Sequence, residues 1–124
     1  MKKTILVIDD EPQILWIAST RLQSGGHAVI TALSGEQGLK KAQKEIPDLI
    51  LLDHVMPEMN GDEVLARLKK DPATRHIPVV MFTADVKRVK VGEYQSQGAA
   101  DCLFKPFTPE ELLSKIQEVL DKKA

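Results

Sequence analysis

Short apolar runs alternate with helical patterns along the whole chain, and this alternation constrains the fold more than any other feature. The runs ILVI (Ile5 to Ile8), LILL (Leu49 to Leu52) and VVMF (Val79 to Phe82) have the length and composition of buried strands. In the stretches between the runs, apolar residues recur at helical spacing. Strands that alternate with helices are typical of a parallel sheet with helices on both faces. The sequence therefore predicts an α/β protein.

Differences among the five runs indicate the order of the strands. The first, third and fourth are apolar throughout, as interior strands are, whereas the second (Ala28 to Leu33) and the fifth (Asp101 to Phe104) are more mixed. With right-handed crossovers, this pattern favours a doubly wound, five-stranded parallel sheet in the flavodoxin-like order 2-1-3-4-5. The winding direction then reverses between the first and third strands, where ligands bind in such sheets.

Capping residues and helix breakers predict where the helices begin and end. A first helix should begin at Pro12 and end at Gly25, and Pro72 should end the third. The fourth, about Val86 to Ser96, contains Val and Gly and should be the weakest and most mobile. Capping-box spacing marks three further helix starts, namely Ser34 with Gln37, Asn60 with Glu63 and Thr108 with Glu111.

Length and charge limit the classes of function. The 124 residues fit one domain, residues 1–124, with no output domain after the last helix. Seventeen basic and eighteen acidic residues give a net charge of -1, which argues against direct binding to nucleic acid or a membrane. A single cysteine and the lack of an apolar run near ~20 residues favour the cytoplasm.

Polar side chains follow four of the apolar runs. They are Asp9 and Asp10, then Asp53, Thr83 and Lys105. Because the carboxyl ends of parallel strands meet at one edge of the sheet, we expect them to lie together. Carboxylates this close need a counter-charge, and a set with no His or Cys favours Mg²⁺. The hydroxyl and the ammonium could stabilise a phosphoryl group that is transferred to a carboxylate.

Two phosphate-binding motifs are absent from the sequence. It contains neither G-x-x-x-x-G-K-[ST] nor G-x-G-x-x-G. A tightly held nucleotide is therefore disfavoured as the phosphoryl donor. A phosphorylated residue on another protein, or a small phosphodonor, fits better.

These residues resemble the receiver domain of two-component response regulators. The resemblance covers essentially the whole chain and rests on Asp9-Asp10, Asp53 in L-L-D-x-x-M-P-x-x-x-G, Thr83-Ala84 and Lys105-Pro106-Phe107. It implies that Asp53 accepts a phosphoryl group from a histidine kinase or histidine phosphotransferase. It also implies a protein that catalyses only its own phosphorylation and dephosphorylation. Such a stand-alone receiver signals by docking to a partner, which the sequence does not identify, or by relaying the phosphoryl group.

The resemblance also implies a role for each site residue. Asp10, Asp53 and the backbone carbonyl of Val55 would ligate Mg²⁺, and Asp9 would act mainly through water. Thr83 and Lys105 would contact the phosphoryl oxygens. The peptide bond between Lys105 and Pro106 would be cis.

Three positions bear on rate and switching. Val55 has no polar group to orient an attacking water, so the phosphoryl group should be lost slowly, and Asp85 is the second position assigned to rate tuning. Cys102 lies three residues before Lys105, where many family members have Tyr or Phe. We therefore expect the fourth helix, rather than residue 102, to carry the response.

Two alternative functions use the same aspartyl chemistry or the same fold. An aspartyl-phosphate-forming phosphatase or phosphotransferase often has D-x-D after its first strand, where this chain has Asp9-Asp10-Glu11 and no cap domain. A flavodoxin-type electron carrier is disfavoured, because it would need a phosphate loop that the sequence lacks. Three histidines, His27, His54 and His76, lack metal-ligand spacing and are interpreted as incidental. Trp16 and Tyr94 are interpreted as isolated aromatics.

Overall fold

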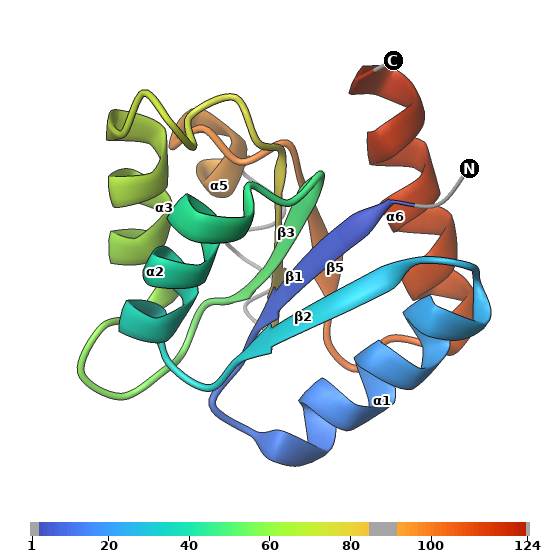
Figure 1. Cartoon of the computed structure of the whole chain (residues 1–124). Helices are drawn as coiled ribbons and strands as arrows, with labels where there is room; N and C mark the ends of the chain where they lie inside the picture. Colours follow the sequence, from blue (N-terminus) through green and yellow to red (C-terminus); the bar gives the residue numbers. More distant parts are fainter. Residues whose placement is uncertain (1–2, 85–91, 124) are drawn as a thin grey trace.

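A computed structural model describes residues 3–84 and 92–123. Strands and helices alternate along these residues, as the sequence predicts (Figure 1). The strands are β1 (Thr4–Ile8), β2 (Ala28–Ala32), β3 (Leu49–Asp53), β4 (Val79–Thr83) and β5 (Asp101–Phe104). The helices are α1 (Pro12–Ser24), α2 (Gly35–Glu45), α3 (Gly61–Lys70), α5 (Glu93–Ser96) and α6 (Pro109–Lys123).

The strands form one parallel sheet in the order β2-β1-β3-β4-β5. The predicted order 2-1-3-4-5 is therefore confirmed, with β1, β3 and β4 in the interior. Ile8 pairs with Leu52 and Asp53 with Phe82, so β1, β3 and β4 end close together. This register brings the residues after β1 next to the end of β3.

Helices cover both faces of the sheet. Figure 1 shows α1 and α6 on one face and α2, α3 and α5 on the other. Successive strand residues point to opposite faces. In β1, Leu6 and Ile8 therefore join the core under α2 and α3, while Ile5 and Val7 join the core under α1 and α6. Both faces are buried, which explains why the interior runs are apolar throughout.

The predicted helix ends are largely confirmed. Pro12 is the first residue of α1, and Gly25 is its C-cap. The predicted caps are also formed. The side chain of Ser34 accepts from the Gln37 amide, and that of Asn60 accepts from the Glu63 amide. Thr108 and Glu111 form a capping box, in which the side chain of each accepts from the backbone amide of the other.

Two of the predicted boundaries differ from the observed elements or extend beyond the described residues. Strand β2 ends at Ala32 rather than Leu33, because the Leu33 amide donates to the side chain of Gln37 instead of to β1. The predicted helix over 86–96 lies partly outside the described residues, and α5 is the part that the structure describes. None of the helices within 3–84 and 92–123 is long and apolar enough to span a membrane.

Candidate functional site

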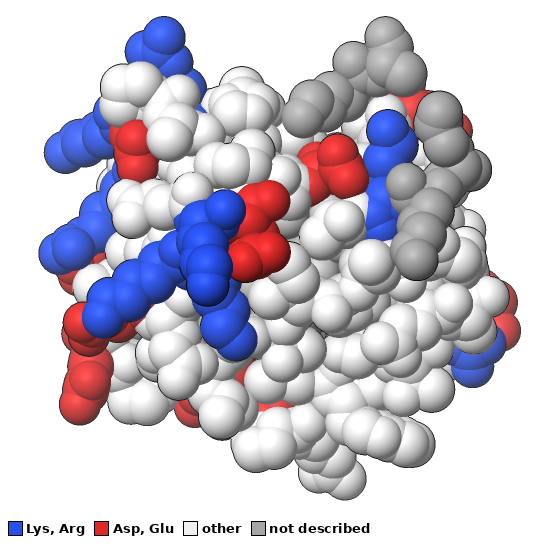
Figure 2. Space-filling view, in the orientation of Figure 1, with Lys and Arg blue, Asp and Glu red and all other residues white. Residues whose placement is uncertain are grey.

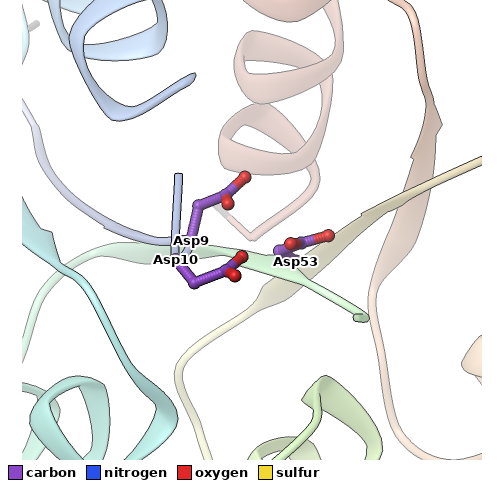
Figure 3. A group of neighbouring side chains, drawn as sticks. All are labelled: Asp9, Asp10 and Asp53. Atoms are coloured by element: carbon purple, nitrogen blue, oxygen red, sulfur yellow. The ribbon is translucent and has the colours of Figure 1, made fainter. Parts of the chain in front are cut away.

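The predicted site residues converge at the carboxyl edge of the sheet. Asp9 and Asp10 follow β1, Asp53 and Thr83 are the last residues of β3 and β4, and Lys105 follows β5. One carboxylate oxygen from each of the three aspartates lies within 4.8 Å of those of the other two. Figure 3 shows these carboxylates gathered beside the ends of β1 and β3. The structure therefore confirms that the residues meet.

Lys105 lies between the buried carboxylates. Its Nζ is 3.1 Å from Asp53 Oδ1 and 3.4 Å from Asp9 Oδ2, and it lies 4.6 Å from the centre of the Phe82 ring. Burial disfavours the charged ammonium. The carboxylates of Asp53 and Asp9 nevertheless hold the pKa of Lys105 above its ordinary value. Lys105 is therefore a fixed cation aimed at Asp53.

Burial and a neighbouring negative charge both act on Asp9. Its side chain is fully buried, and this burial, together with the charge of Asp53, raises the pKa of Asp9 from 3.8 to about 7. The Glu11 amide donates to Asp9 Oδ1 at 2.9 Å, and Lys105 also favours the ionised form, but both only partly offset the rise. The described group therefore contains more negative charge than Lys105 balances.

A divalent cation fits this donor set. The three aspartates offer only carboxylate oxygens, which suit Mg²⁺ better than Zn²⁺. A cation bound there would also offset the two causes that raise the pKa of Asp9, which are its burial and, to a smaller extent, the charge of Asp53. The cluster is thus consistent with the predicted metal site, with Asp10 only half-buried and accessible.

The site opens into a cavity of about 390 Å³. Val55 stands at its mouth with 75% of its surface exposed, while Asp53 and Thr83 are buried inside. The cavity can therefore admit a group from outside, and its wall near Val55 is apolar. Its lining residues are Asp10, Glu11, Asp53, Val55, Thr83, Ala84 and Lys105.

A larger hollow, about 490 Å³, lies between α2 and α3, away from this site. Figure 2 shows Lys and Arg side chains over these helices, interspersed with Asp and Glu. Lys40 is 3.7 Å from Glu36, and Arg67 is 2.8 Å from Glu63. Since these charges pair with one another along each helix, the hollow presents no convergent reactive groups.

Gly61 explains part of the motif that surrounds Asp53. Its amide donates to the carbonyl of His54 at 2.7 Å, which places the start of α3 directly against the end of β3. A Cβ atom at this position would overlap the carbonyl oxygen of Asp53 and lie 2.8 Å from the Cα of His54. Only glycine permits this approach. The last glycine of L-L-D-x-x-M-P-x-x-x-G therefore holds the loop that carries Asp53.

Three further predicted features are the peptide bond before Pro106, Cys102 and Asp85. The peptide bond between Lys105 and Pro106 is cis, as predicted. Cys102 is buried in β5, its Sγ 3.7 Å from Gln95 Oε1, and it does not line the cavity. Asp85 lies outside the described residues.

One feature was missed at the sequence level. Tyr94 is fully buried, and its hydroxyl is 3.0 Å from Nδ1 of His54. Nε2 of His54 is 3.0 Å from Asp62 Oδ2. The interpretation of Tyr94 as isolated is therefore wrong, and His54, interpreted as incidental, is hydrogen-bonded through both ring nitrogens. The adjacency of His54 to Asp53 was the available signal, but Tyr94 is 40 residues away and no spacing links the two.

Comparisons with known proteins agree with this geometry. A family model described as "Response regulator receiver domain" matches residues 5–117. The chain is 38% identical to protein PilH of Pseudomonas aeruginosa over 116 residues, covering 94% of this chain and 96% of PilH. It is also 38% identical to the alkaline phosphatase synthesis transcriptional regulatory protein PhoP of Bacillus subtilis, covering 97% of this chain and 49% of PhoP. The chain thus spans about half the length of PhoP.

Solved structures give the same result. The chemotaxis protein CheY4 of Vibrio cholerae superposes with a TM-score of 0.89 at 35% identity. The match covers 96% of this chain and 99% of CheY4. The similarity therefore extends over nearly the whole of both chains.

Proposed function

The chain belongs to the response regulator receiver domain family, whose members act in phosphorylation-switched signalling, and we propose that Asp53 is its phosphoacceptor. The observation that carries this proposal is the position of Asp53. It is buried at the end of β3, and its Oδ1 is 3.1 Å from the ammonium of Lys105. One of its carboxylate oxygens also lies within 4.8 Å of carboxylate oxygens of Asp9 and Asp10. We further propose that residues 1–124 act as a single receiver domain.

The metal site would be formed by Asp53 together with residues that lie near it. Asp10, Asp53 and the backbone carbonyl of Val55 would hold Mg²⁺, and Asp9 would act mainly through water. Bound there, Mg²⁺ supplies positive charge next to the phosphoryl oxygens. The excess negative charge and the oxygen-only donor set support this assignment.

The chain's own side chains would carry the transfer. A carboxylate oxygen of Asp53 forms a bond to phosphorus while the bond from phosphorus to the donor's imidazole nitrogen breaks, and the electron pair leaves with that nitrogen. Lys105 and the Thr83 hydroxyl stabilise the charge on the equatorial oxygens. The domain would thus catalyse its own phosphorylation and dephosphorylation and no reaction of other substrates.

The partners follow from this chemistry. The donor would be the phosphohistidine of a histidine kinase or a histidine phosphotransferase. The signal would leave by docking to a downstream protein or by relay of the phosphoryl group, in the cytoplasm and without direct contact with nucleic acid or membrane. The alternative of an aspartyl-phosphate phosphatase gains no support from the comparisons.

Phosphodonor labelling tests the assignment. The protein is incubated with Mg²⁺ and a small acyl phosphate, and its intact mass is measured over time. We expect one added phosphoryl group per chain, and none in Asp53→Asn. Asp48→Asn is the matched control, because Asp48 accepts from the Thr4 amide at the opposite edge of the sheet. Undiminished labelling of Asp53→Asn would overturn the proposal, and rapid multiple turnover would favour the phosphatase.

A further inference from the structure

Three polar side chains form a hydrogen-bonded series beside the phosphoacceptor. The hydroxyl of Tyr94 in α5 is 3.0 Å from Nδ1 of His54, and Nε2 of His54 is 3.0 Å from Asp62 Oδ2 in the first turn of α3. The rings of His54 and Tyr94 also meet edge to face, with their centres 5.5 Å apart. We call these residues the Tyr94–His54–Asp62 series.

The chemistry of the series is self-consistent. In the neutral histidine tautomer with the proton on Nε2, Nδ1 accepts from the tyrosine hydroxyl and Nε2 donates to the carboxylate. Tyr94 is fully buried and the His54 side chain is 14% exposed. Buried polar groups that lose a partner are costly, so this geometry is strongly specified.

The position of His54 gives the series its significance. It directly follows Asp53, and successive side chains at the end of a strand point to opposite sides. Asp53 therefore faces the cavity while the His54 ring contacts α3 and α5. The His54 carbonyl accepts from the Gly61 amide at 2.7 Å, so backbone and ring are both held. A backbone shift at Asp53 would therefore strain the hydrogen bonds that hold His54.

A second contact of α5, from β5, is weaker. Cys102 Sγ is 3.7 Å from Gln95 Oε1, and a thiol is a weak donor. The tyrosine hydroxyl and the imidazole form a shorter and stronger hydrogen bond.

We propose that His54 is a positioning residue that couples the phosphoacceptor loop to α5 through Tyr94. Phosphorylation of Asp53 moves the backbone at Asp53, the His54 ring transmits this movement, and α5 responds. The inference rests on the proposed function of Asp53, but it assigns the route to residues outside the reacting group.

Hydrogen exchange on phosphorylated protein tests the coupling. Wild type, Tyr94→Phe, His54→Ala and the double variant are labelled with the acyl phosphate, and intact mass confirms occupancy. We expect phosphorylation to change amide exchange in α5 by about fivefold in wild type, a typical coupling strength, and to leave it nearly unchanged in each variant. Because the series acts as a unit, the double variant should lose no more than either single variant.

A matched control removes a different buried hydroxyl. Thr74 Oγ1 donates to the Leu68 carbonyl at 2.8 Å, and Thr74→Val should lower stability yet keep the full response of α5. A wild-type response in phosphorylated Tyr94→Phe would overturn the inference. So would additive losses in the double variant.

The design also separates failure of the coupling from failure of the proposed function. If wild type takes up no phosphoryl group, the assignment of Asp53 is wrong. The series is then tested with Mg²⁺ alone, by the NMR signals of the His54 ring and the Tyr94 amide. Mg²⁺ should shift both signals in wild type, and the Tyr94 signal much less in His54→Ala. Equal shifts of the Tyr94 amide in both proteins would overturn the coupling.

Discussion

Two adjacent residues at the end of β3 serve two very different polar groups. Asp53 belongs to a cluster in which three carboxylates lie within 4.8 Å of one another beside the ammonium of Lys105. His54 belongs to a series in which it contacts Tyr94 and Asp62 at 3.0 Å each. The first group has excess negative charge, whereas in the second each donor meets an acceptor.

The difference separates binding from transmission. Unbalanced buried charge is costly and is relieved by a proton or by a ligand from outside, so the Asp53 cluster is suited to hold a cation and a phosphoryl group. A hydrogen-bonded series needs nothing from outside. It holds two helices against the strand end and is suited to pass on a change that occurs next to it.

The largest expected effect concerns Mg²⁺ and the unbalanced cluster. Bound Mg²⁺ should raise the free energy of unfolding by about 2.7 kcal/mol at a hundredfold excess over its Kd, by mass action. Asp10→Asn removes the accessible carboxylate and should abolish most of this gain. Denaturant titrations with Mg²⁺ and with a chelator measure it. An intact Mg²⁺ effect in Asp10→Asn would show that Asp10 is not a ligand.

The next effect is the pH dependence of the metal-free protein. The pKa of Asp9 is raised from 3.8 to about 7 in the folded state, so the folded protein keeps a proton that the unfolded chain releases within this window. The contribution of Asp9 to stability is complete below the unfolded-state pKa of 3.8, and it is lost as the pH rises through the folded-state pKa of about 7. Asp9→Asn cannot lose a proton, and it should be about 2 kcal/mol more stable than wild type at pH 8 in chelator.

The same variant tests whether charge or packing makes Asp9 unfavourable in the cluster. The stability gain of Asp9→Asn should shrink at low pH, because Asp9 is then protonated in the wild type. It should also shrink with Mg²⁺, because the cation supplies the missing charge. A gain that is the same at pH 5 and pH 8 would mean that packing rather than charge disfavours Asp9.

The two polar groups were not equally predictable from the sequence. Asp9, Asp53, Thr83 and Lys105 each follow an apolar run, and parallel strands bring such residues together by topology alone. Local signals also sufficed for most helix ends, since a cap such as Ser34 and its partner Gln37 lie three residues apart. The sheet order followed from which runs are apolar on both faces.

The His54 series could not be found in this way. Asp62 is 8 residues from His54 and Tyr94 is 40 residues away, on an element with no fixed spacing to β3. Its geometry depends on the close approach of α3, which Gly61 permits, and on where α5 packs. These are tertiary distances that no periodicity encodes. The one-residue error at the end of β2 has a local origin instead, because the side chain of Gln37 takes the Leu33 amide.

A smaller effect should distinguish Thr83 from Cys102 in the response to phosphorylation. The Thr83 hydroxyl should follow the new phosphoryl oxygens, so Thr83→Ala should weaken the coupling between Asp53 and α5 by about fivefold. Cys102→Ala should change it little, because the thiol is small and outside the cavity. Amide hydrogen exchange at Ala84 and in α5, with and without phosphorylation, measures the effect of each variant. If the switch ran through Cys102, Cys102→Ala would have the larger effect and Thr83→Ala the smaller.

The smallest expected effect concerns loss of the phosphoryl group. Hydrolysis needs a water in line with the bond between Asp53 and phosphorus, and Val55 at the mouth of the cavity has no group to orient one. Val55→Asn and Val55→Gln add a hydrogen-bonding side chain at a position that is 75% exposed, so little folding stability is at stake. We expect dephosphorylation to become about threefold faster, which corresponds to a barrier lower by about 0.6 kcal/mol.

The control for Val55 is a change that keeps its apolar character. Val55→Ala removes two methyl groups and adds no polar atom, so it tests whether the valine merely crowds the approach of water. Loss of label is followed by intact mass after the donor is removed. A faster rate in Val55→Asn alone means that orientation of water limits hydrolysis, and an equal rate increase in Val55→Ala means that crowding does. Unchanged kinetics in all three variants would exclude Val55 from rate tuning. The hydrolysis rate would then be set by other residues that line the cavity, such as Thr83 and Lys105.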